Sequence, residues 1–231
     1  MAKREVVIKR AAEMIVELGV KSLRVDDLAR DLAVSKRTLY EMFGDKEELL
    51  YHSVKLLFHN EANEIQASAM GAQSGIPALL EIFDEMMARS AVRKRIMENL
   101  AKFYPELYER IMTENRDYGL AMLREKLTRL VEEGLISEIV NIDLSITMLY
   151  YTSMGLMRRH GRLVLPNGVT EQDALRYTIV NFFRGIATLK GVEQIDKYLA
   201  EKTKDESRKT KDERRKMTAA IKPRGRFNND K

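Results

Sequence analysis

The sequence predicts an all-α protein in which a small N-terminal three-helix domain precedes a larger helical domain. Apolar residues recur at helical spacing along almost the whole chain, and no segment alternates apolar and polar residues as a half-buried strand does. Breaks rich in glycine and proline interrupt the pattern at Gly71 to Pro77, at Pro105 and at Gly134. With 231 residues, 45% of them hydrophobic, the chain is long enough to bury two cores.

The first 35 residues predict two helices and a tight turn. Val7, Ile8, Ala11, Ala12, Ile15 and Leu18 make one apolar face, and Gly19 ends that helix. Leu28, Ala29 and Leu32 recur at helical spacing in a second, short helix. Only Ala33 and Val34 separate Leu32 from Ser35, the predicted N-cap of the next helix. The short connection is typical of the turn in a helix-turn-helix unit.

The next helix of the unit is predicted to begin at Lys36, with Ser35 as its N-cap, and to end at Gly44. Asp45 and Glu48, an acidic relative of the capping box, start a further helix near Lys46, directly after the helix-turn-helix unit. The expected domain boundaries are residues 1–50 for the helix-turn-helix domain, 51–200 for the larger domain and 201–231 for a charged tail.

The helix that begins at Lys36 has a buried side, made by Leu39 and Phe43, and a basic, hydroxyl-bearing outward side. Such a helix can place its first turn in the major groove, where Lys and Arg reach guanine and hydroxyls reach phosphates. We therefore predict DNA contacts at Arg24, Ser35, Lys36, Arg37, Thr38, Tyr40 and Lys46. A generic three-helix core would explain the apolar spacing equally well, but not the ordered run from Ser35 to Lys46.

The same stretch resembles the tetracycline-repressor (TetR) family of bacterial regulators over about residues 4 to 55. The matching residues are Leu28-Ala29, Val34-Ser35, Thr38-Leu39-Tyr40, Phe43 and Lys46-Glu47-Glu48-Leu49. Three residues depart from the family pattern: Ala33 replaces the usual Gly of the turn, Arg24 a frequent Thr, and Arg37 a frequent Gly. The resemblance implies a homodimeric DNA-binding regulator that is released from DNA by a small molecule.

The rest of the chain predicts helices and nothing else. We expect them at about residues 46–70, 77–90, 91–103, 105–133, 142–160 and 171–199. Two segments, Leu144 to Met157 and Leu175 to Leu189, are apolar around most of their circumference. A second copy of the chain would cover them in a four-helix contact, which is also where TetR-like repressors dimerise, whereas in a monomer they would be central core helices.

A ligand pocket is predicted from the many Met and Tyr residues between Phe83 and Met157. Flexible Met side chains suit an adaptable apolar cavity, and Tyr hydroxyls can orient a guest. The pocket candidates are Tyr104, Tyr118 and Met122. An ordinary helical core would use the same residue types.

The positive charge of the chain is concentrated at its C-terminus. The net charge is +5, and residues 201–231 hold 12 Lys or Arg and 6 Asp or Glu, so the other 200 residues carry a net charge of −1. Residues 1–50 hold ten charges of each sign, so DNA affinity there depends on arrangement. The tail is expected to be a solvated extension, helical to about Ala220, either without a task or acting as an auxiliary non-specific DNA arm.

Other functions find little support in the sequence. Without cysteine there is no disulfide or thiolate metal site, and no Gly-rich phosphate loop or nucleophile elbow occurs. His52 and His59, with Glu48 one turn before, are expected to be ordinary exposed residues and not a metal site. We expect no enzyme, cofactor, signal segment or membrane partner, and a cytoplasmic protein.

Taken as a whole, the sequence predicts a ligand-responsive transcriptional regulator, a repressor released from a palindromic operator by a small apolar molecule. Two alternatives remain open: a helix-turn-helix protein without an effector, and a structural helical interaction protein.

Overall fold

The computed structural model describes residues 4–72, 74–158 and 165–220, with residues 70–72, 157–158 and 205–220 described by their backbone alone. This part of the chain is helical nearly throughout, as predicted. The elements are α1 (Arg4–Leu18), the 3₁₀ turn η1 (Val20–Ser22), α2 (Val25–Asp31), α3 (Lys36–Phe43), α4 (Lys46–Ala72), α5 (Gly75–Ala88), α6 (Ser90–Phe103), α7 (Pro105–Glu132), α8 (Ile142–Arg158), α9 (Glu171–Ile186) and α10 (Leu189–Ala220).

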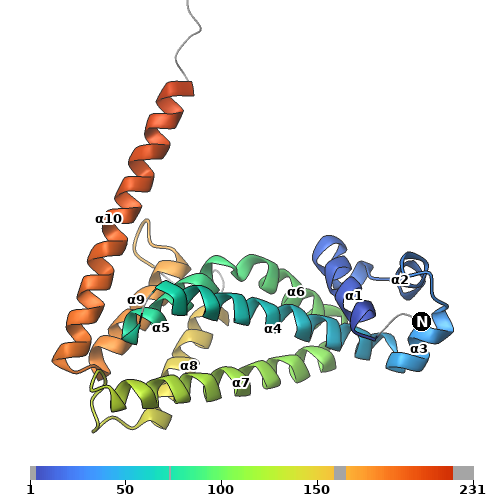
Figure 1. The fold of residues 1–231 in the computed structure, drawn as a ribbon, viewed down its shortest axis with the longest axis horizontal. Coiled ribbons are helices and arrows are strands. Elements are labelled where there is room, and N and C mark those ends of the chain that lie inside the picture. Colours follow the sequence, from blue (N-terminus) through green and yellow to red (C-terminus); the bar gives the residue numbers. More distant parts are fainter. Residues whose placement is uncertain (1–3, 73, 159–164, 221–231) are drawn as a thin grey trace, which may run out of the picture.

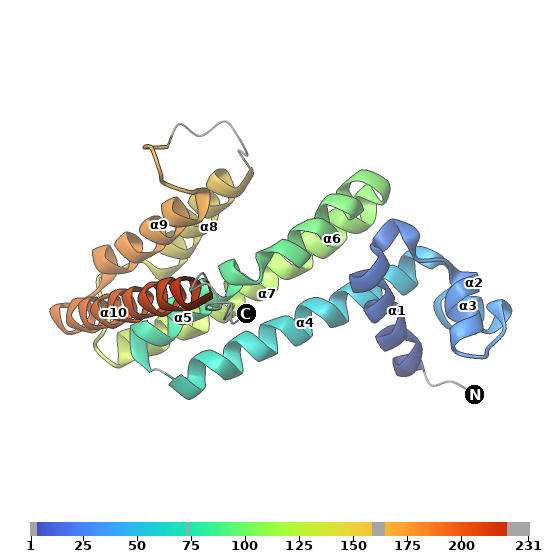
Figure 2. The ribbon, with the colours of Figure 1, turned by 90° about the horizontal axis from the view of Figure 1, so that it is seen from above.

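The helices form an elongated molecule with α1 to α3 at one end and α10 at the other (Figure 1, Figure 2). Two long helices, α4 and α7, run along the body between these ends. Helix α10 projects away from the body, so its C-terminal part lies far from α2 and α3 in both views.

The core at the N-terminal end extends beyond the three-helix unit. Buried residues of α1, α2, α3 and the start of α4 pack with Ile96 and Leu100 of α6 and with Leu107 and Ile111 of α7. The guanidinium of Arg95 on α6 also donates to the carbonyl oxygen of Val16, with 2.7 Å between donor and acceptor. The N-terminal helices therefore pack directly against the end of α6 and the start of α7.

A second core fills the other end of the molecule. It is built from the end of α4, from α5, from the second half of α7, and from α8, α9 and α10. Phe183, Leu127 and Ile195 are fully buried in it. Helices α4 and α7 contribute to both cores, because each is long enough to span the body.

Two local predictions from the sequence are wrong. Leu18 does not belong to the buried face of α1: its side chain is exposed, and Met14 is buried in that face instead. The helix expected over residues 171–199 is two helices, α9 and α10, separated at Ala187 and Thr188.

The break between α9 and α10 is made by contacts with the segment that follows α7. Ala187 is extended and forms an isolated antiparallel bridge with Ile136, and the Thr188 amide donates to the Leu135 carbonyl oxygen over 3.0 Å. A Cβ atom at Gly191 would collide with that same carbonyl oxygen, so the residue must be glycine for the close approach. These partners are distant in sequence, so helical periodicity could not reveal the break.

Helix α10 is fixed to the body at its base by a buried tyrosine. The Tyr198 hydroxyl lies 2.8 Å from a carboxylate oxygen of Glu81 and 2.8 Å from one of Asp84, both on α5. Lys202 binds Glu81 at 2.8 Å, and Arg176 of α9 binds Asp84 at 3.2 Å. Burial and the two carboxylates raise the pKa of Tyr198, so its proton stays in place as the donor that joins α10 to α5.

Candidate nucleic-acid interface

Helix α3 is an eight-residue helix with a well-defined cap at each end. The Ser35 side chain accepts a hydrogen bond from the Thr38 amide over 3.0 Å, which makes it the N-cap that the sequence predicts. Gly44 has a φ of 78°, and its amide donates to the Tyr40 carbonyl oxygen at 2.7 Å. Leu39 and Phe43 are buried beneath the helix and hold it against the N-terminal core.

The turn between α2 and α3 uses a left-handed residue. Ala33 has a φ of 52°, and among the described residues it is the only one other than glycine with a positive φ. The Val34 amide reaches back to the Ala29 carbonyl oxygen over 2.9 Å, the long hydrogen bond of a Schellman-type helix end. The turn geometry is therefore kept although Ala stands at the left-handed position.

The two cations at the start of α3 are exposed and paired with carboxylates. The Lys36 ammonium lies 2.9 Å from a carboxylate oxygen of Asp26 in the first turn of α2. The Arg37 guanidinium lies 2.9 Å from a carboxylate oxygen of Glu41, one turn further along α3. The hydrogen bond that Lys36 donates to the Asp26 carboxylate raises the pKa of Lys36, so the lysine is charged at neutral pH.

The other predicted contact residues of the unit differ in how free their side chains are. Tyr40 is exposed, and so is Arg24, which occupies the N-cap position of α2 without a capping hydrogen bond from its side chain. The Thr38 hydroxyl lies 2.8 Å from the Ser35 hydroxyl. Ser35 and Thr38 are therefore already engaged with each other at the N-terminus of α3.

Helix α4 starts directly after the unit, and Asp45 caps it by accepting the Glu48 amide at 2.8 Å. The reciprocal half of a capping box is not formed, because the Glu48 side chain turns to Arg110 and His52 instead. The Lys46 ammonium lies 5.6 Å from the centre of the Tyr104 ring. This cation–π contact joins a predicted phosphate-binding residue to the junction of α6 and α7.

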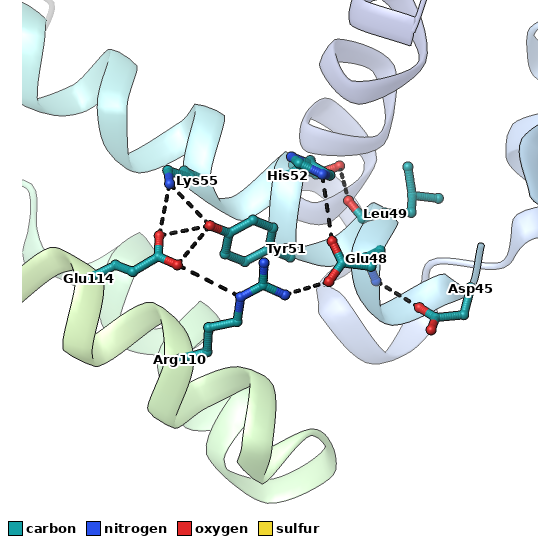
Figure 3. Close-up of polar contacts among 9 residues, drawn as sticks. Asp45, Glu48, Leu49, Tyr51, His52, Lys55, Arg110 and Glu114 are labelled. Carbon is teal, nitrogen blue, oxygen red and sulfur yellow. Dashed lines mark hydrogen bonds and ion pairs between the residues drawn. The ribbon is translucent and has the colours of Figure 1, made fainter. Parts of the chain in front are cut away.

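A polar network links the first turns of α4 to α7 (Figure 3). The Tyr51 hydroxyl donates to the Glu114 carboxylate, at 2.7 and 2.8 Å from its two oxygens, and Lys55 binds that carboxylate at 2.8 Å. The Arg110 guanidinium lies 3.6 Å from the centre of the Tyr51 ring and also binds Glu48. The network thus ties the helix that follows α3 to the body of the molecule.

The network also sets the charge states of its members. Hydrogen bonds from Lys55 and Tyr51 hold the pKa of Glu114 below its usual value, so the carboxylate is ionised. Burial lowers the pKa of His52, and the charge of Arg4 adds to the effect, so this histidine is neutral at pH 7.

Sequence reasoning missed this network. Tyr51 and Lys55 stand four residues apart, a spacing that indicates contact on one helix face. Glu114 lies 63 residues beyond Tyr51, and no local pattern could connect them. The missing information is the pairing of α4 with α7.

The three pocket candidates do not meet in one place. Tyr104 is half-buried at the turn before α7, packed against the N-terminal core. Tyr118 and Met122 lie one turn apart, about 21 Å further along α7 by the rise of an α-helix, and Tyr118 is 54% exposed. Tyr104 therefore belongs to the junction with the N-terminal helices.

The apolar face predicted on the late helices is partly open. Leu144, Met148 and Tyr151 follow one another at helical spacing on α8 and are all more than half exposed. Tyr177 of α9 is 73% exposed. Leu189, the last residue of the second predicted segment, begins α10 and is not part of α9. The side chain of Met157, the last residue of the first segment, lies outside the described residues.

Two further findings concern other kinds of site. Within the described residues, no cluster of three or more His, Asp or Glu side chains could hold a metal ion. In the same part of the chain, none of the helices combines the length and the apolar character that crossing a membrane requires.

The fold and the capped α3 define the class: an all-helical protein with an N-terminal helix-turn-helix domain and a larger helical body. Residues 7–52 match the family model described as bacterial regulatory proteins of the tetR family. This match confirms the resemblance to the TetR family that the residues of the helix-turn-helix stretch indicate.

Solved structures share the fold at low sequence identity. A transcriptional regulator from Cytophaga hutchinsonii is 16% identical with a TM-score of 0.61, over 80% of this chain and 98% of that one. The fatty acid degradation regulator FadR from Bacillus halodurans is 16% identical with a TM-score of 0.52, over 80% of this chain and 100% of that one. A protein from Saccharomonospora viridis, solved in complex with choline, is 16% identical with a TM-score of 0.54. The match covers 79% of this chain and 96% of that one. Among curated proteins, nothing matches significantly.

Proposed function

We propose that this protein is a transcriptional regulator that binds a palindromic DNA operator as a homodimer. The observation that carries the proposal is α3, a capped helix with exposed Lys36, Arg37 and Tyr40 at the outer end of the molecule (Figure 1). Its first turn is free to enter a major groove, and two copies about 34 Å apart would read successive grooves.

The assigned contacts follow from the position of each side chain. We assign base contacts to Lys36 and Arg37, and phosphate contacts to Tyr40 and Lys46. Arg24, at the start of α2, adds a further exposed cation near the same end. The Ser35 and Thr38 pair fixes the start of α3, and one of its hydroxyls is expected to reach a phosphate. The unit of residues 1–50 performs this binding, residues 51–200 provide dimerisation and effector binding, and residues 201–231 form the tail.

We further infer that a small apolar effector releases the operator. Among the fold neighbours, one is named for fatty acid degradation and another was solved in complex with choline, so a chain with this fold can hold a small molecule. An effector in the larger domain would move α4 or α7, which both enter the N-terminal core, and so change the distance between the two α3 helices. Efficient release needs several kcal/mol of preference for the state that does not bind DNA.

The test of the assignment is DNA binding by the full chain and four variants. Sequences bound by the wild type are selected from a random duplex library and used as the probe. Replacing Tyr40 by Phe or Lys46 by Met is expected to weaken binding to all sequences, and the loss of the Lys46 charge is also expected to flatten the salt dependence. Replacing Lys36 by Met or Arg37 by Met is expected to relax preference at particular bases by about 1 to 3 kcal/mol.

Unchanged affinity in all four variants would refute the placement of the interface. A failure to enrich any sequence would favour the second candidate function, a helical interaction protein. A library of apolar compounds, screened for thermal stabilisation and for loss of DNA binding, separates an effector-responsive regulator from one without an effector.

A further inference from the structure

Both cations at the start of α3 are held by carboxylates of the same helix-turn-helix unit. Asp26 holds Lys36 at 2.9 Å and Glu41 holds Arg37 at 2.9 Å. All four side chains are about half exposed or more, and Arg37 is the freest at 88%. The carboxylates therefore lie on the solvent side of the unit, next to the groups assigned to DNA.

The charge of the unit is balanced by these carboxylates. Residues 24–46 hold five Lys or Arg and five Asp or Glu, so the unit as a whole is neutral. Exposed ion pairs of this kind contribute little to folding, because water solvates both partners well in the unfolded chain. Their main physical consequence arises when a polyanion approaches.

DNA of any sequence attracts a protein through the number of phosphates that its cations neutralise. A lysine or arginine that keeps a carboxylate at its side neutralises no additional phosphate, and the carboxylate itself is repelled. At a correct site, the cation also forms hydrogen bonds to base edges, and these bonds can compensate for the loss of the ion pair with the carboxylate. A paired cation therefore penalises non-specific binding more than specific binding.

We propose that Asp26 and Glu41 are specificity-determining residues that suppress non-specific DNA binding by holding Lys36 and Arg37 in ion pairs. The proposal rests on the DNA-binding function proposed above. Asp26 has the larger effect, because its partner Lys36 begins the recognition helix and the pair joins α2 to α3. The Glu41 pair lies within one helix and exchanges more freely with solvent.

The test compares full-length wild type with D26N and E41Q on a random-sequence duplex of about 30 base pairs, over a salt titration around 100 mM. D26N is expected to bind this duplex roughly 5- to 10-fold more tightly, with a salt slope steeper by up to about one. Affinity for the selected operator should rise by a smaller factor, so the ratio of specific to non-specific affinity falls. E41Q is expected to act in the same direction with a smaller change.

The matched control is D143N. Asp143 on α8 is also exposed and paired with an arginine, Arg124 at 2.6 Å, and its replacement changes the net charge by the same amount. D143N should leave the affinity for random DNA unchanged. In addition, the gain from D26N should shrink when Lys36 is replaced by Met, because the double-mutant cycle isolates the pair.

An equal gain in D143N would overturn the proposal in favour of a simple net-charge effect. A D26N variant that binds random DNA no better, or worse, than wild type while remaining folded would overturn it as well. If wild type and variants bind neither random nor selected duplexes, the proposed function fails and the inference fails with it. If wild type binds DNA and D26N leaves the affinity ratio unchanged, the inference alone fails.

Discussion

At the scale of single residues, Ala33 shows what the helix-turn-helix geometry demands. Its φ of 52° places an L-residue in the left-handed region, where the Cβ atom approaches the following carbonyl oxygen. The sequence already marked this position, because the family turn usually has glycine there. The backbone keeps the turn because the Val34–Ala29 hydrogen bond and the buried Leu28 and Leu39 on either side hold it.

Replacing Ala33 by Gly is expected to stabilise the protein. Relief of the left-handed strain outweighs the extra entropy of glycine in the unfolded chain, for a net gain of about 0.5 to 1 kcal/mol. For a chain of this size the melting temperature should rise by roughly 1 to 4 °C. A33G is compared by thermal unfolding with A121G, a helical position on α7 where glycine should lower the melting temperature. A decrease in A33G would contradict the interpretation of the turn.

The sequence could not predict which side chains surround Lys46. Its place at the start of α4 predicts contact with a phosphate, but its ammonium lies over the ring of Tyr104. Tyr104 was predicted as a pocket residue because of its type. In the fold it belongs to the junction between the N-terminal helices and α7.

At the scale of elements, α4 and α7 connect the two ends of the molecule. Each contributes buried residues to both hydrophobic cores, and the network around Tyr51 and Glu114 joins them close to the N-terminal helices (Figure 3). Helices α4 and α7 are therefore joined there by hydrogen bonds and ion pairs as well as by apolar packing.

The ionised Glu114 is expected to make stability depend on pH. Its pKa in the fold is below its ordinary value of 4.5, so its contribution is complete above about pH 4.5 and is lost as the pH falls through the folded pKa. E114Q should be less stable than wild type near pH 7, by about 1 kcal/mol, and the difference should shrink towards pH 3. Thermal unfolding across this range measures it.

The control for that series is E109Q, an exposed carboxylate of the same helix outside the network. It should follow the wild-type melting curve at every pH. The interpretation would be wrong if E114Q and wild type differed by a constant amount from pH 7 to pH 3.

At the scale of the whole molecule, the face on α8 and α9 is the surface we assign to dimerisation. Leu144, Met148 and Tyr151 line up on α8 and remain more than half exposed in the single chain. A two-fold axis through this face would pair two copies of the same helices and fix the distance between the N-terminal domains.

M148E is expected to weaken the dimer by at least about tenfold, because a carboxylate would be buried without a partner at the centre of the face. Sedimentation velocity over a concentration series measures the shift to monomer. I139E is the control, since Ile139 is 95% exposed in the segment between α7 and α8 and lies outside the face. A dimer that survives M148E, or dissociates equally in I139E, would place the interface elsewhere.

The sequence by itself determined the helical class, the limits of most helices and the whole α2–α3 unit. These are local properties: apolar residues recur within a few positions, and Ser35, Gly44 and Asp45 act on amides and carbonyls of the adjacent turns. The resemblance to the TetR family rests on the same short stretch, and the family model matches residues 7–52.

Only the tertiary structure decided which distant residues meet. It separated α9 from α10 through the contact of Ala187 with Ile136, and it brought Glu114 to Tyr51 and Tyr104 to Lys46. It also placed Asp26 on Lys36 across the turn, ten positions apart, where no helical periodicity applies. Such pairs depend on where and at what angle two helices cross. That geometry is set by side-chain packing in both cores, so the residue pattern within one helical turn does not reveal it.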